Sequence, residues 1–115
     1  MLRSGLILAL LGIGLPALAE ERKLSGAEIK QALSGHTLKG ESDNGEWTQD
    51  FDPSGRTTYS QGNSNSPGIW QVKGDQYCSS WPPNPNLSCY DVTEDGNTIT
   101  FISAGGGRAP AVIAK

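Results

Sequence analysis

The sequence predicts a small, mainly β domain with one short helix at its N-terminal end. Two observations carry this prediction: short strand-like segments are separated by turn-forming residues roughly every 8–12 residues, and a single stretch carries a helix-start signal. The length of 115 residues leaves room for one domain and excludes a multidomain enzyme. The net charge of −3 is too small to indicate nucleic acid or an anionic membrane as a partner.

The first nineteen residues have the layout of a cleaved secretory signal. Arg3 supplies the basic start, and an apolar run follows from Gly5 to Leu15. Ala17 and Ala19 occupy the two small positions that precede a cleavage site. We therefore expect cleavage before Glu20 and a periplasmic or secreted mature protein.

An uncleaved membrane anchor is the alternative for this segment. The apolar run is shorter than the roughly 20 residues that a spanning helix needs, and it contains three glycines and ends at Pro16. We therefore expect residues 20–115 to form the mature domain, with no stable membrane insertion after cleavage.

The expected mature chain, residues 20–115, is poor in aliphatic side chains and depends on aromatic ones. Loss of Arg3 leaves 8 basic and 12 acidic residues, which is a net charge of −4 and too modest to indicate disorder. All eight aromatic residues lie in this part and can build a small core, in which we place Trp47 and Trp70. The eight are Trp47, Phe51, Tyr59, Trp70, Tyr77, Trp81, Tyr90 and Phe101.

The helix is predicted just after the expected cleavage site. Ser25 and Glu28 have the spacing of a capping box, in which the serine accepts from a backbone N–H and the glutamate reaches back to the cap. Leu24 and Ile29 are placed to form a hydrophobic staple around it. Gly35 ends the helix after about nine residues, so the helix must dock on the rest of the domain to persist.

Eight strands are predicted after the helix. Asp52–Gly55 is a strong type I turn signal, and Gly62–Gly68 has the composition of a flexible loop. The regular alternation of short strands and turns predicts an antiparallel meander barrel of about eight strands, lipocalin-like with a filled or narrow interior. A flattened sandwich is the alternative. The expected strands are 36–41, 46–51, 56–61, 69–73, 76–80, 88–92, 98–103 and 109–114.

Cys78 and Cys89 are the only cysteines, and export would place them in an oxidising compartment. If their segments are antiparallel strands, the two side chains can face each other and form a structural disulfide around the proline-rich stretch Trp81–Asn86. Such a loop is stabilised by roughly 2–3 kcal/mol in the chain-entropy model. A redox pair would normally have C-x-x-C spacing, and a metal site needs more ligands than two cysteines and one histidine offer.

The sequence predicts no catalytic residues, no metal site and no cofactor. His36 is the only histidine, and we interpret it as a polar residue beside a helix C-terminus rather than as a base. Asp50 and Asp52 share a face of one predicted strand and are the best candidates for a catalytic carboxylate pair. The turn that begins at Asp52 accounts for an aspartate at this position without a catalytic role.

Three aromatic residues around the disulfide are the candidates for ligand or partner contacts: Tyr77, Trp81 and Tyr90. They either fill the barrel or line a pocket or exposed patch. Trp81 opens the proline-rich stretch, so the disulfide would hold it in a pre-organised recognition loop.

Four segments of the chain form a recognisable pattern: Leu24–Ile29, Gly68–Cys78, Cys89-Tyr90 and Asp95-Gly96, of which the most specific is G-x-W-x-V-x-G-D-x-Y-C. In these segments the chain resembles a loose group of small exported bacterial proteins whose function is not established. The resemblance implies export, the disulfide and a β fold, and it brings no catalytic residues with it.

The leading hypothesis is an exported, non-enzymatic barrel that binds a small ligand or an envelope protein partner. Two alternatives stay open: a small periplasmic enzyme that uses carboxylates such as Asp50 and Asp52, and a purely structural envelope protein. Two carboxylates converging in a concave pocket would favour the enzyme, whereas an apolar cavity or an exposed aromatic patch would favour binding.

Overall fold

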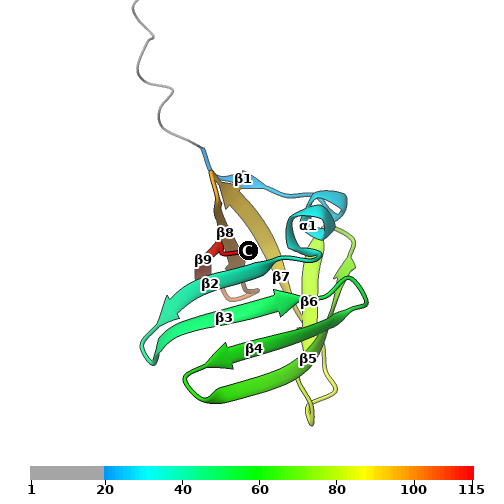
Figure 1. The fold of residues 1–115 in the computed structure, drawn as a ribbon. Coiled ribbons are helices and arrows are strands. Elements are labelled where there is room, and N and C mark those ends of the chain that lie inside the picture. The colour runs from blue at the N-terminus through cyan, green and yellow to red at the C-terminus, as the bar shows by residue number, and fades with distance from the viewer. Residues whose placement is uncertain (1–19) are drawn as a thin grey trace, which may run out of the picture.

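The barrel is closed. A computed structural model describes residues 20–115, and the predicted secretory signal lies outside the described residues. Strands β2 to β9 each pair antiparallel with the next strand in sequence, and β9 pairs back with β2 (Figure 1). This closure confirms a meander barrel and decides against the sandwich. The strands are β2 (Thr37–Ser42), β3 (Gly45–Phe51), β4 (Arg56–Gln61), β5 (Ser64–Lys73), β6 (Gln76–Ser80), β7 (Ser88–Asp95), β8 (Thr98–Ile102) and β9 (Arg108–Ile113).

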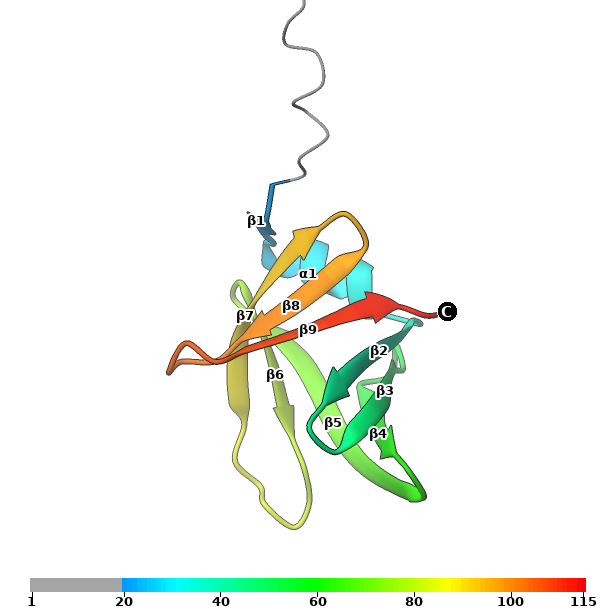
Figure 2. The same cartoon turned by 90° about the vertical axis from the view of Figure 1, so that its left-hand side faces the viewer.

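Helix α1 (Gly26–Leu33) lies at one end of the barrel, and the long β6–β7 connection extends from the opposite end (Figure 2). The capping box is confirmed: the Glu28 N–H donates to Ser25 Oγ over 3.3 Å, and the Ser25 N–H donates to Glu28 Oε1 over 2.9 Å. Leu24 and Ile29 are both buried, as the staple predicts. A short strand that the sequence did not predict, β1 (Arg22–Lys23), pairs with β7 outside the barrel.

The helix rests on the turn between β5 and β6. A Cβ atom at Gly26 would lie 2.1 Å from the carbonyl oxygen of Gly74, so only glycine permits this approach. The Gly26 N–H donates to Asp75 Oδ1 over 2.7 Å, which satisfies one of the helix's unpaired N-terminal N–H groups. The helix is thereby held against the barrel by its backbone as well as by its apolar face.

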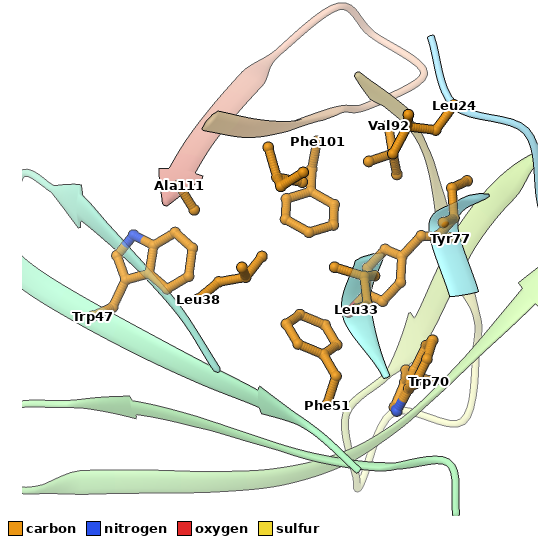
Figure 3. Close-up of a cluster of buried hydrophobic side chains, with 12 residues drawn as sticks. Leu24, Leu33, Leu38, Trp47, Phe51, Trp70, Tyr77, Val92, Phe101 and Ala111 are labelled. Atoms are coloured by element: carbon orange, nitrogen blue, oxygen red, sulfur yellow. The ribbon is translucent and has the colours of Figure 1, made fainter. Parts of the chain in front are cut away.

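The core fills the half of the barrel next to the helix. Leu33 from α1, Phe51 from β3 and Phe101 from β8 point toward a common centre (Figure 3). Trp47 is 8% exposed and Trp70 is 6% exposed, which confirms both as core residues. The Phe51 ring meets Trp70 edge-on at a centroid distance of 5.6 Å, an arrangement that aromatic pairs favour.

Six of the eight predicted strands match the observed bounds to within one residue, and the other two are longer than expected. Strand β7 continues to Asp95 because residues 93–95 pair with the start of β8. The flexible loop predicted over Gly62–Gly68 is wrong: β5 begins at Ser64. The polar residues at the start of β5 pair with β4, and the Ser60 hydroxyl donates to Asn65 Oδ1 over 2.7 Å. Pairing with a neighbouring strand thus overrides a composition typical of loops.

The predicted disulfide is present between Cys78 and Cys89. The two residues are direct partners across β6 and β7, and their Cα atoms are 4.0 Å apart. Cys78 is fully buried. The disulfide therefore links β6 to β7 from within the core, where the long connection between these strands begins and ends.

Candidate functional site

A cavity of about 720 Å³ opens beside the core, and the core side chains Trp47, Tyr77 and Phe101 form part of its lining. Its rim comes from the β2–β3 turn, the chain just after β6 and the start of β9, and its interior side chains come from β3, β4, β6, β7 and β8. The lining residues are Glu41, Ser42, Asp43, Trp47, Gln49, Tyr59, Ser66, Tyr77, Ser79, Trp81, Tyr90, Phe101, Arg108, Ala109 and Pro110.

One wall consists of Trp47, Tyr59 and Trp81. The Trp47 and Tyr59 rings stack at a centroid distance of 5.4 Å with 25° between their planes. The ring centroids of Tyr59 and Trp81 lie 6.3 Å apart with 80° between the ring planes, so these two rings are nearly perpendicular. Trp47 is buried, whereas Tyr59 and Trp81 are half-buried and carry the accessible ring surface.

Tyr77, Tyr90 and Phe101 form the second aromatic group. Tyr77 lies 5.0 Å from Phe101 and 5.9 Å from Tyr90 between ring centroids. Tyr77 and Phe101 are buried, and Tyr90 is half-buried. Each ring is held by its neighbours, so the cavity is formed before any ligand arrives.

Polar side chains inside the cavity have their N–H groups committed to internal hydrogen bonds. Gln49 Nε2 donates to Thr57 Oγ1 and to the Tyr77 hydroxyl, both over 3.0 Å. Trp81 Nε1 donates to Ser79 Oγ over 3.2 Å. Burial raises the pKa of Tyr77, so its hydroxyl stays protonated at neutral pH. The polar groups that these bonds leave for a ligand are mainly hydroxyls, such as those of Tyr59, Ser66 and Tyr90, which can accept or donate.

Two glycines leave the space that two of the cavity's tryptophan rings occupy. A Cβ atom at Gly40 would lie 2.3 Å from Cζ2 of Trp47, and one at Gly68 would lie 2.5 Å from Cε3 of Trp81. Real Cβ contacts do not come this close, so a side chain at either position would displace the indole from its present place.

The rim carries Glu41, Asp43 and Arg108. The Arg108 guanidinium donates to Glu21 Oε2 in an ion pair, and the same carboxylate oxygen accepts from the Thr93 hydroxyl over 2.6 Å. These bonds, from Thr93 first and then from Arg108, lower the pKa of Glu21. Glu41 and Asp43 take part in no ion pair within residues 20–115, so the rim is acidic.

Tyr77, Trp81 and Tyr90, the three residues predicted as ligand or partner contacts, lie together in one cavity. Sequence reasoning missed Gln49 and Arg108. Gln49 stands between Trp47 and Phe51 at the strand period of two, and this polar residue on an inward face was the available signal. Nothing in the sequence pointed to Arg108, whose partner Glu21 is 87 residues away.

Asp50 and Asp52 do not reach the aromatic cavity. Both border a separate hollow of about 290 Å³ on the outside of the barrel. Asp50 Oδ1 accepts from the Thr37 hydroxyl over 2.7 Å, and Asp52 Oδ2 accepts from the Ser54 N–H over 2.9 Å in the predicted turn. Hydrogen bonds from Ser54 lower the pKa of Asp52, so its carboxyl group stays ionised.

His36 lines neither cavity. Its Nδ1 atom is buried and has no hydrogen-bond partner among the described residues. Within residues 20–115, no three histidine, cysteine or acidic side chains gather as metal ligands. That same part of the chain holds no helix with the length and apolar character needed to cross a membrane.

No protein-family profile matches the chain, and neither the curated proteins nor the solved structures include a significant match.

Proposed function

We propose that this protein is an exported, non-enzymatic β-barrel that binds a small ligand in its aromatic cavity. One observation carries the proposal: six aromatic rings line a cavity of about 720 Å³, and three of them also belong to the packed core. Ligand sites of roughly 300–1,000 Å³ with mostly apolar walls and a few polar atoms are typical. An eight-stranded barrel is wide enough to hold one small ligand.

The cavity is organised in the absence of a ligand. The stacked pair Trp47–Tyr59 and the hydrogen bond from Trp81 to Ser79 fix the rings in place. A ligand that enters therefore has few side chains to order, which lowers the entropic cost of binding.

The carboxylate enzyme is the weaker alternative. Asp50 and Asp52 border one small hollow, the arrangement that would favour an enzyme, but both are exposed and each accepts from a neighbouring hydroxyl or N–H. A general acid needs a raised pKa to hold its proton near neutral pH, whereas the pKa of Asp52 is lowered. The geometry favours binding over this chemistry.

Export is supported by the layout of residues 1–19 and by the resemblance to small exported bacterial proteins. The Cys78–Cys89 disulfide agrees with an oxidising compartment, since structural disulfides are rare in reducing ones.

Titration with N-phenyl-1-naphthylamine, a neutral fluorescent probe, tests ligand binding. We expect saturable fluorescence enhancement with the purified, oxidised protein, and a large loss of affinity in Trp81→Ala and Tyr90→Ala. Leu87→Ala is the matched control, because Leu87 belongs to the same connection but does not line the cavity. Absence of saturable binding, or equal binding by all variants, would overturn the proposal.

A protein partner is the second candidate, and the exposed β6–β7 connection favours it. Leu87 is 37% exposed there, next to the disulfide that closes the loop. Pull-downs from a bacterial cell envelope with the wild type and Leu87→Asp test this role. A partner retained by the wild type and lost with the variant supports it, and equal capture contradicts it.

A further inference from the structure

On the premise that the aromatic cavity binds a small ligand, we propose that its ligand is a small organic cation bearing an alkylated or quaternary ammonium group. The rings, the committed N–H groups and the charges at the rim each point to this class.

Five of the six rings in the cavity belong to tryptophan or tyrosine, whose π faces attract cations most strongly. Tyr59, Trp81 and Tyr90 are the half-buried members and offer their surface to a ligand. Because Tyr59 and Trp81 stand 80° apart, they form a corner in which one cationic group can contact two rings. Attraction of this kind acts within about 6 Å of a ring centroid.

The polar atoms of the cavity select against anions. The side-chain N–H groups of Gln49 and Trp81 are already used by Thr57, Tyr77 and Ser79. An anion would find hydroxyl donors but, among the lining residues, no cation without an acidic partner, because Arg108 is paired with Glu21. Burying a charge without an oppositely charged partner is unfavourable. A quaternary ammonium group needs no hydrogen bond, and a protonated amine would find oxygen acceptors.

The rim adds a negative field. Glu41 and Asp43 carry carboxylates without an ion pair in the part of the chain that the structure describes, whereas Arg108 is neutralised by Glu21. Like charges around an opening raise the local concentration of the opposite ion. Both rim acids are exposed, so their contribution falls as salt is added.

Choline and 3,3-dimethylbutan-1-ol provide a direct test, because they share a shape and differ in charge. Calorimetric titration should show choline binding at least about tenfold more tightly than its neutral isostere. The advantage should shrink in high salt and in the double variant Glu41→Gln, Asp43→Asn. Glu46→Gln is the matched control. Glu46 is an exposed acid that does not line the cavity and that forms an ion pair with Lys39.

The two proposals fail separately. Binding of N-phenyl-1-naphthylamine with no preference for choline over the isostere overturns the cationic ligand and leaves the small-ligand function standing. Binding of neutral glucose more tightly than choline overturns it in the same way. If the naphthylamine, choline and the isostere all fail to bind, both proposals are overturned.

Discussion

The indole of Trp47 packs against Gly40, its direct partner across strands β2 and β3. Trp81 packs in the same way against Gly68 of β5. Each tryptophan occupies the space that a side chain at the glycine would fill, so the two glycines determine where two rings of the cavity lie. The shape of the cavity therefore depends on residues that do not themselves line it.

Gly68→Ala should displace Trp81 and weaken binding of the naphthylamine probe by about tenfold, which is 1.4 kcal/mol. The added methyl would stand 2.5 Å from the Trp81 ring and 2.8 Å from the Ser80 carbonyl oxygen, so the half-buried indole and the backbone next to it must both shift. Gly105→Ala is the control because nothing lies within 4 Å of its Cβ position. Fluorescence titration of the three proteins checks this, and unchanged affinity in Gly68→Ala would contradict it.

Gly40→Ala should lower the free energy of unfolding by about 1–3 kcal/mol, the usual effect of overpacking a core. Trp47 is confined by Gly40 on one side and by the stacked Tyr59 ring, so it has less freedom to yield than Trp81. Urea denaturation followed by tryptophan fluorescence measures the change. A variant as stable as the wild type would show that the indole relaxes without strain.

Reduction of the Cys78–Cys89 disulfide should destabilise the domain by roughly 2–3 kcal/mol, because the open chain gains conformational entropy when it unfolds. Denaturation with and without a reductant measures this, with the double variant Cys78→Ala, Cys89→Ala as the reductant-insensitive control. Thiol labelling of the purified native protein should find no free cysteine. Labelling at both positions would mean that the disulfide is absent from the native protein.

Ser25→Ala should lower stability by about 1 kcal/mol, since it removes the acceptor for the Glu28 N–H at the start of α1. Ser25→Asp retains an acceptor and should recover most of the loss. Thermal denaturation of the three proteins distinguishes capping from a general effect of substitution. Equal loss in both variants would contradict a capping role.

Stability should fall on acidification below about pH 4, because three carboxyl groups have lowered pKa values in the fold: Glu21, Glu28 and Asp52. A depressed pKa contributes stability above the unfolded value, and this contribution is lost as the pH falls through the folded value. Asp52→Asn should therefore show a smaller loss between about pH 5 and pH 2 than the wild type. Urea midpoints across that range provide the measurement, and an unchanged slope would contradict the assignment.

The sequence determined those features that depend on neighbours along the chain. The helix start needs only Ser25 and Glu28 three residues apart, and the turn at Asp52–Gly55 needs only its own four residues. The alternation within a strand and the disulfide across one hairpin are equally local. Eight of the nine strands and the aromatic core follow from these signals.

Tertiary structure decided which of these elements meet. The pairing of β9 with β2 closes the barrel, and the strand register then gathers Tyr59, Trp81 and Tyr90 around one cavity. The same register places Gly40 under Trp47 and brings Arg108 to Glu21. Local signals specify where a strand forms and which of its residues point inward. Which inward residues of distant strands face each other depends on how far the strands are shifted along one another. Only closure of the barrel sets that shift.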